Sequence, residues 1–456
     1  MTEVDSVAAS LAPDALPALK ARANELLNMA GDAGACAAEV SIGVAEGLSV
    51  SVRLGEVETL EFHRDRGISL TVYSEDGGGG LRKGSASSSD ESPASLARTV
   101  AAAMAIADHT GADPASGLAA PQQLASELPD LDLYHPWSLS PQQAMELAQS
   151  CEAAGRSDAR ISNSDGANLS SGNSLRVYAN SQGFCAGYAA SQHSLSCVLV
   201  AGEQDAMQRD YWFDSRRDPA ALMAAEAIGA EAQRRTLARL GAEPPATGNY
   251  PILFAPRAAA SLLGHLTAAI SGGALYRNAS FLRDRLGEQL FPHWVHIHER
   301  PLLPGSAGSA AWDQDGLATR NQAFVEGGTL SRYALGLYAA RRLDMAPTGN
   351  GGGVRNLTID SSGEDLPTLL GQMGRGILVT EVMGPGVNIV TGDYSRGAAG
   401  FLIENGQIGR PLHEFTIAAP LTEIFARLVA AGTDVDDRGN IHCGSLLVEQ
   451  MRVAGS

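Results

Sequence analysis

Four consecutive residues, Asp393, Tyr394, Ser395 and Arg396, bring a carboxylate, a phenol, a hydroxyl and a guanidinium together. Apolar runs flank them and glycines bracket them, which predicts a polar loop between two strands. A guanidinium can hold a peptide carboxylate through two hydrogen bonds, and a tyrosine ring can cover an extended chain. We therefore predict either a substrate groove here or an Asp393–Arg396 pair that only fixes the loop.

Histidines and cysteines are the other residues that could do chemistry. His296 and His298 would share one face of a strand, which is a chelating geometry, and His293 is close. We favour an edge-strand pair over a metal site, because no carboxylate or thiol stands at a set spacing from them. The five cysteines show no Cys-x-x-Cys spacing, so we expect reduced thiols rather than disulfides or a zinc ribbon.

Several common site motifs are absent from the sequence. It contains no Gly-x-Ser-x-Gly elbow, no phosphate-binding loop with Gly-Lys-Ser/Thr and no dinucleotide fingerprint after a strand. The glycine run at 347–355 could present backbone N–H groups to an anion. Without a strand-to-helix context, a mobile loop is the expectation there.

Charge and hydropathy exclude two classes of partner. With 51 acidic against 33 basic residues the formal charge is −18, which repels a phosphate backbone, so we expect no direct nucleic-acid binding. We find no apolar run of about 18 residues that would span a membrane. The first five residues are acidic and do not resemble an export signal, so we expect a cytoplasmic protein.

A chain of 456 residues exceeds what one core usually serves, and proline-rich or glycine-rich breaks predict three domains, 1–112, 113–243 and 244–456. The first two should each be a helix, a β-meander and a helix. Expected helices in these two domains are 14–30, 92–107, 140–154 and 219–240. Expected strands are 38–44, 48–53, 56–63, 68–73, 160–167, 174–180, 183–200 and 210–213.

The third domain is rich in glycine and in strand patterns, with helices expected at 258–270, 365–371 and 421–431. Asn405-Gly406 suits a type I′ hairpin turn. The fold class predicted for the whole chain is α+β. It consists of two helix, meander and helix units followed by a largely antiparallel, barrel-like β domain.

One stretch of this third domain carries a family resemblance. Val-Thr-Glu-Val-Met-Gly-Pro-Gly-Val at 379–387, Thr-Gly-Asp-Tyr-Ser-Arg-Gly-Ala-Ala-Gly-Phe at 391–401 and Glu-Asn-Gly at 404–406 closely resemble the PmbA (TldE) branch of the TldD/PmbA family. The resemblance extends over nearly the whole chain. It implies a cytosolic protease system that acts on peptides, whose members are also called modulators of DNA gyrase.

The resemblance also implies where a metal would be bound. In the TldD branch zinc is held by a His-Glu-x-x-x-His helix motif, with the Glu as general base. The matching positions here are His265, Leu266 and Ile270, so two of three groups are lost. We therefore predict no catalytic residue and no metal in this chain. His265 is expected beside the 393–396 loop in substrate binding, and Cys443, near the family's thiolate position, as a buried thiol.

The resemblance thus implies a subunit that forms a heteromer with a TldD-like chain and helps enclose unfolded or short peptides, while the partner carries the zinc. We expect a homo- or heterodimer. Two alternatives stay open. The chain could be a metallopeptidase on its own, using His296, His298 or Cys443. It could also be a structural homodimer without a peptidase role.

Overall fold

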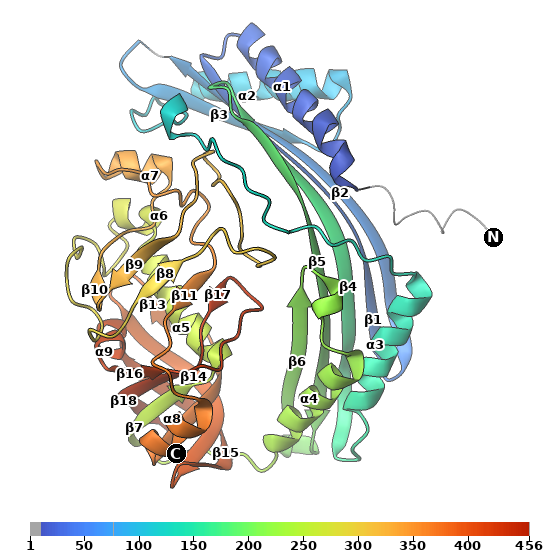
Figure 1. Cartoon of the computed structure of the whole chain (residues 1–456), viewed down its shortest axis with the longest axis vertical. Helices are drawn as coiled ribbons and strands as arrows, with labels where there is room; N and C mark the ends of the chain where they lie inside the picture. Colours follow the sequence, from blue (N-terminus) through green and yellow to red (C-terminus); the bar gives the residue numbers. More distant parts are fainter. Residues whose placement is uncertain (1–10, 76, 456) are drawn as a thin grey trace.

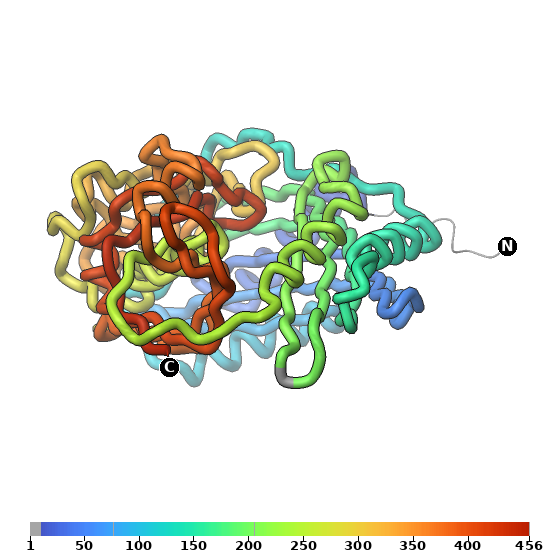
Figure 2. The backbone as a smooth tube through the Cα atoms, turned by 90° about the horizontal axis from the view of Figure 1, so that it is seen from below, coloured from blue at the N-terminus to red at the C-terminus, as the bar shows by residue number. Residues whose placement is uncertain are grey.

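The computed structural model describes residues 11–75 and 77–455. It has two halves that face each other (Figure 1): a long curved sheet with helices, built by residues up to about 240, and a compact β-rich half built by the remainder. Seen from below, the chain crosses from one half to the other near residue 240 (Figure 2). The fold is α+β, as predicted.

Six antiparallel strands form the long sheet in the order β3-β2-β1-β4-β5-β6. Their bounds are β1 Ala37–Arg53, β2 Glu56–Glu75, β3 Leu81–Ser88, β4 Ile161–Asn180, β5 Cys185–Ala201 and β6 Gln208–Arg216. Because β1 pairs with β4 from Glu39–Asn180 to Val52–Ala167, the two predicted N-terminal units share one sheet.

The breaks predicted within β1, β2 and β4 are wrong, since each is one continuous strand. Gly47 shows why the sequence misleads. It pairs with His63 on one side and with Gly172 on the other. A Cβ there would lie 2.5 Å from the His63 ring and 2.8 Å from the Ser171 carbonyl oxygen. This glycine therefore permits close packing of strands and does not mark a turn.

Four helices cover one face of the sheet: α1 Leu16–Asp32, α2 Pro93–His109, α3 Pro141–Gly155 and α4 Ala225–Ala238. The buried residues of β1 alternate, so Val40 and Ile42 meet α1 and α2 while Val50 and Val52 meet α3 and α4 on the same face. Ser140 caps α3 by accepting from the Gln143 backbone N–H at 3.2 Å. The predicted helix 219–240 begins only at Ala225, after a short 3-10 turn, Pro219–Ala221.

A buried carboxylate ties the two N-terminal units together. Glu152, on α3, is 1% exposed and accepts the backbone N–H groups of Leu54 and Gly55, both at 2.8 Å. These two residues form the β1–β2 turn and both have positive φ, 54° and 86°. A charged acceptor that satisfies two turn amides in the interior fixes the end of this hairpin against α3.

The C-terminal half contains a closed barrel of five strands, β12-β7-β18-β15-β14, in which β14 pairs back to β12. The barrel-like prediction is confirmed. The strand bounds in this half are β7 Gly248–Phe254, β12 Gly376–Met383, β13 Val387–Asn388, β14 Asp393–Glu404, β15 Gln407–Pro420, β16 Leu428–Ala431 and β18 Leu446–Ala454. Asn405 and Gly406 turn β14 into β15 with positive φ, 52° and 72°, as a type I′ turn requires.

A second, smaller sheet has the order β10-β9-β8-β11-β17, with bounds β8 Ile297–Glu299, β9 Gln322–Glu326, β10 Thr329–Leu330, β11 Leu357–Ile359 and β17 Ile441–His442. The helices of this half are α5 Pro256–Ala269, α6 Gly272–Tyr276, α7 Leu337–Arg342, α8 Leu366–Met373 and α9 Leu421–Ala426. The predicted helix 421–431 is therefore half helix and half strand, because β16 follows α9 at once. None of the helices in the described ranges is long and apolar enough to cross a membrane.

The contact between α3 and α4 allows a test of this packing. A Cβ on Gly229 of α4 would collide with the carbonyl oxygen of Cys151 on α3. We expect Gly229→Ala to destabilise the protein by about 1–3 kcal/mol, the usual cost of overpacking, and to lower its thermal unfolding midpoint. Gly31→Ala is the matched control: Gly31 is also helical, and a Cβ there meets nothing within 4 Å. An equal effect of the two changes would contradict the packing.

Candidate functional site

Helix α5 is the element on which the predicted metal chemistry would depend. Leu266 lies within it and Ile270 directly follows it, and both are 0% exposed. Their side chains belong to the main core cluster, with residues of barrel strands β7 and β12. His265, which directly precedes Leu266 in the helix, is half-buried. The positions that the resemblance singles out are thus partly core positions.

The donor set at this helix does not fit zinc. Structural and catalytic zinc sites are built from thiolates, imidazoles and carboxylates, and neither Leu266 nor Ile270 offers a lone pair. Within residues 11–75 and 77–455, no group of three His, Cys, Asp or Glu side chains is placed to hold a metal ion. A lone His265 would leave the ion with one protein ligand.

Cys443 lies at the other end of α5. Its side chain is 0% exposed and its thiol donates to the carbonyl oxygen of Pro256 at 3.4 Å. Burial, reinforced by Asp436 and Asp434, raises the pKa of this thiol. Nine residues separate Pro256 from His265, roughly 13 Å along a helix. The thiol is therefore neutral and distant from the imidazole.

The predicted loop at 393–396 is wrong, because these residues open strand β14. Their exposure alternates: Asp393 and Ser395 are exposed, while Tyr394 is 2% exposed. Such alternation is typical of a strand with one buried face. Asp393 accepts from the Thr391 hydroxyl at 2.6 Å, whereas Arg396 donates to the carbonyl oxygens of Val382 and Met383 at 3.3 and 3.4 Å.

The structure does bring His265 to this strand. Its ring meets the Tyr394 ring edge to face, with centroids 5.9 Å apart. The His265 Nε2 and the Tyr394 hydroxyl are both buried and have no hydrogen-bond partner among the described residues. Burial, and then the positive charge of Arg396, lower the pKa of His265, and burial raises the pKa of Tyr394 to about 12. Both groups are neutral near pH 7, and their part in substrate binding stays a prediction.

His296 and His298 do not form the predicted edge-strand pair, because His298 lies in β8, the middle strand of the small sheet, and His296 directly precedes that strand. The Nε2 of His298 accepts from Arg300 at 2.9 Å and is 3.2 Å from an Asp360 oxygen. The Nδ1 of His296 accepts from the Gly327 backbone N–H at 3.3 Å. Each histidine therefore already uses one nitrogen on the protein.

The glycine run at 347–355 is fixed to the core, contrary to the expectation of a mobile loop. Glu299, 1% exposed, accepts from the Asn350 side chain at 2.8 and 2.9 Å and from the Arg355 backbone at 2.9 Å. Asp313 accepts from the Gly351 N–H at 2.7 Å. Sequence reasoning missed these buried acids, because no local pattern distinguishes them from surface carboxylates.

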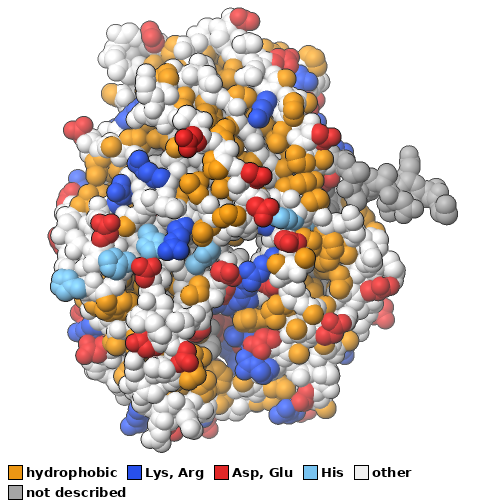
Figure 3. Space-filling view, in the orientation of Figure 1, with side chains coloured by type: hydrophobic (Ala, Val, Ile, Leu, Met, Phe, Trp, Pro, Cys, Tyr) orange, Lys and Arg blue, Asp and Glu red, His pale blue; other side chains and the backbone are white. Residues whose placement is uncertain are grey.

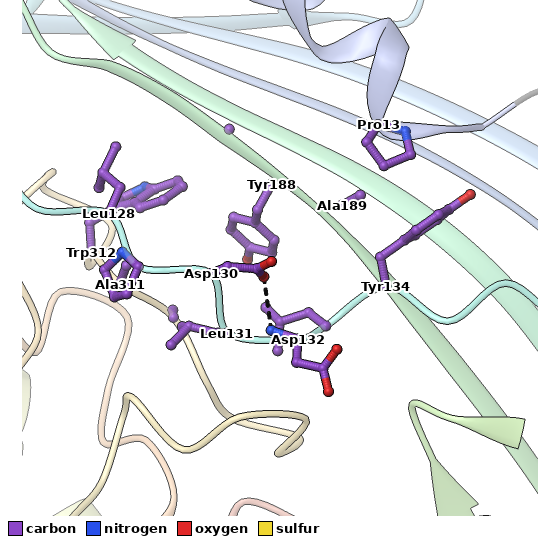
Figure 4. A pocket seen from close by; sticks show the side chains of 14 residues that line it. Pro13, Leu128, Asp130, Leu131, Asp132, Tyr134, Tyr188, Ala189, Ala311 and Trp312 are labelled. Carbon is purple, nitrogen blue, oxygen red and sulfur yellow. Dashed lines mark hydrogen bonds between the residues drawn. The ribbon is translucent and has the colours of Figure 1, made fainter. Parts of the chain in front are cut away.

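Three cavities accompany these elements. The largest, 520 Å³, lies beside the C-terminal end of α5, between Thr267, Tyr276, Tyr338 and the glycine run. A second, 430 Å³, lies between the segment 128–134, β5 and Trp312 (Figure 4). There the ring centroids of Tyr188 and Trp312 are 5.3 Å apart, and the Asp130 carboxylate accepts a hydrogen bond from the Asp132 backbone N–H at 3.0 Å. A third, 290 Å³, opens between the two halves.

Comparison with known proteins gives the class. Three family models match in order: PmbA/TldA metallopeptidase domain 1 at 38–107, the central domain at 134–240 and the C-terminal domain at 247–455. The chain is 43% identical to Metalloprotease PmbA of Escherichia coli O157:H7 over 92% of both chains. It is 25% identical to a zinc metalloprotease TldD homolog of Saccharolobus solfataricus over 50% of this chain and 54% of that one. The chain belongs to the PmbA/TldD metallopeptidase family.

Solved structures agree with this assignment. A candidate modulator of DNA gyrase from Bacteroides thetaiotaomicron superposes with a TM-score of 0.90 at 28% identity, covering 96% of this chain and 99% of that one. TldE from Thermococcus kodakarensis gives a TM-score of 0.83 over 95% and 100%, and its 20% identity makes this a likeness of fold.

The pKa of His265 can be tested directly. Because its folded pKa lies below the ordinary 6.5, the neutral ring stabilises the fold above pH 6.5, and this contribution is lost as pH falls below 6.5. An NMR titration, with the ring signal assigned through His265→Gln, should show a midpoint below 6.5. Arg396→Gln should raise that midpoint only in part, since burial is the larger cause. The control Ser395→Ala, on the exposed face, should leave it unchanged; a wild-type midpoint at or above 6.5 would contradict the burial.

Proposed function

We propose that this chain is the PmbA/TldE-like subunit of a cytoplasmic TldD/TldE-type metalloprotease. It pairs with a TldD-like chain, which supplies zinc, the general base and the attacking water. Together the two chains enclose unfolded or short peptides and hydrolyse them. The family membership supports the metallopeptidase class, and the name of the Saccharolobus solfataricus relative associates the TldD branch with zinc.

One observation carries the proposal: the helix that would hold the metal has hydrocarbon side chains built into the protein core. Leu266 and Ile270 are buried against the barrel, so no rotation of their side chains creates a ligand or a base. A chain with this helix needs its chemistry from elsewhere. A sister chain with an intact His-Glu-x-x-x-His helix is the simplest source.

Substrate contact in this subunit is assigned to the exposed side of β14. Asp393 and Ser395 face solvent and the half-buried Arg396 lies beside them, so these three can meet a peptide. The buried side of the strand carries Tyr394, whose ring contacts that of His265, and both residues remain candidates for substrate binding in this proposal.

Two alternative functions require different features of the structure. A self-sufficient peptidase needs a metal at His296, His298 or Cys443, yet one nitrogen of each histidine is engaged and the thiol is neutral. A structural homodimer needs no sister chain at all. The division into three domains, with two boundaries at about 112 and 243, remains part of the proposal, since the first two units share a sheet.

The decisive experiment compares cleavage of an unfolded peptide by this chain alone, by a His-Glu-x-x-x-His sister alone and by both. We expect co-purification of the two chains, cleavage only when both are present, and inhibition by a chelator. Zinc should be found in the sister chain and not in this one. His296→Ala with His298→Ala should leave cleavage unchanged, because neither residue is part of the chemistry.

The sister's Glu→Gln variant, which lacks the base, is the control that should abolish cleavage while leaving the pairing intact. Chelator-sensitive cleavage by this chain alone would establish the self-sufficient peptidase instead. Full activity of the sister alone, with no association between the chains, would favour the structural homodimer.

A further inference from the structure

The 290 Å³ cavity between the two halves combines charge with aromatic rings. It is lined by the end of β6 with Trp212 and Asp214, by the start of α5 and by the segment 434–438. In Figure 3, lysine and arginine side chains gather in the hollow between the halves, with carboxylates beside them. The lining holds four arginines and four aspartates, so the cavity is highly charged without being net positive.

Most of the charges here are already paired. Asp436 binds Arg438 through two hydrogen bonds, at 2.8 and 2.6 Å, and Asp437 binds Arg216 at 2.9 Å. Asp434 accepts from the backbone and hydroxyl of Ser445 at 2.8 and 2.7 Å. The carboxylates of segment 434–438 are therefore satisfied within the protein.

Arg257 differs from its neighbours. Its guanidinium stacks over Tyr211, 4.2 Å from the ring centroid, and lies 5.4 Å from that of Phe213. Among residues 11–75 and 77–455 it makes no hydrogen bond and no ion pair. Stacking engages only the face of a guanidinium, so its N–H donors in the plane stay free for a planar acceptor. Burial, and then Arg438, lower the pKa of this group, whereas the charges of Asp210, Asp436 and Glu381 act in the opposite direction.

A carboxylate is the ligand that this arrangement suits. A fork of parallel N–H donors matches the two oxygens of one carboxylate. Four aspartates line the cavity, Asp214, Asp434, Asp436 and Asp437, and they would repel a dianion such as phosphate more strongly than a single negative charge. The cavity is also small, which suits the end of a chain rather than its middle.

We propose that Arg257 binds the C-terminal carboxylate of a peptide in the cavity between the two halves, with Tyr211 and Phe213 holding the guanidinium in place. This rests on the proposed function, because a peptide substrate carries a free carboxylate at its C-terminus. The site anchors one end of the peptide and selects for a free C-terminus.

The test measures binding to the full-length chain alone, with no sister and no cleavage. The probe is a fluorescein-labelled unfolded peptide, made either with a free C-terminus or with a C-terminal amide, and binding is followed by anisotropy. We expect wild type to bind the free acid about tenfold more tightly, as a charge-assisted pair implies. Arg257→Gln should bind both forms equally, and Arg257→Lys, which keeps the charge without the fork, should fall between.

The exposed Arg320, outside this cavity, provides the control: Arg320→Gln should keep the wild-type preference. Absence of peptide binding by wild type, equal binding of acid and amide by wild type, or an unchanged preference in Arg257→Gln would overturn the proposal. Loss of the preference in Arg320→Gln would overturn it too, since the effect would then be general charge. If Arg257→Gln does not fold, Arg257→Lys replaces it, and a wild-type preference in that variant counts against the site. Failure of cleavage with the preference intact would overturn only the proposed function.

Discussion

The packing of helix α5 against the closed barrel is the constraint on which the rest of the structure depends. The helix covers strands β7 and β12, and Leu262, Leu266 and Ile270 join the same buried cluster as Phe254 and Val379. A helix that closes a barrel in this way must present hydrocarbon toward it. Only the polar side of the helix, where the His265 ring contacts the Tyr394 ring, carries groups that could take part in chemistry.

This constraint bears on two separate properties of the chain, its fold and any peptidase chemistry. The fold likeness to relatives covers nearly the whole chain, with a TM-score of 0.90 for the Bacteroides thetaiotaomicron structure. The zinc motif that the resemblance implies depends on a few positions of one helix, and the matching Leu266 and Ile270 of this chain are part of the core. The fold and the activity therefore depend on different residues.

Sequence reasoning predicted the architecture better than the site. Helix ends marked by Ser-Pro pairs and the Asn405-Gly406 turn rest on local chemistry, which one sequence shows. The lengths of the strands depend on contacts between strands instead. Gly47, for example, is explained only by His63 and Ser171, which come from other strands. The residues 393–396 look polar in a row, yet strand pairing turns Tyr394 inward. The Glu299 and Asp313 contacts join residues about 40 to 50 apart, and no local pattern announces them.

The contact between Glu152 and the β1–β2 turn affects whether the two N-terminal units can be separated. Glu152 follows the linker in the sequence, whereas the turn whose amides it binds precedes the linker. The linker is therefore not the only connection between the two units. A protease that nicks the chain between residues 113 and 133 would leave the pieces bound to each other through β1, β4 and this carboxylate. A fragment that ends at residue 112 would lose the acceptor for two turn amides and expose one side of β1. Truncation at that boundary is therefore a poor route to a smaller working unit.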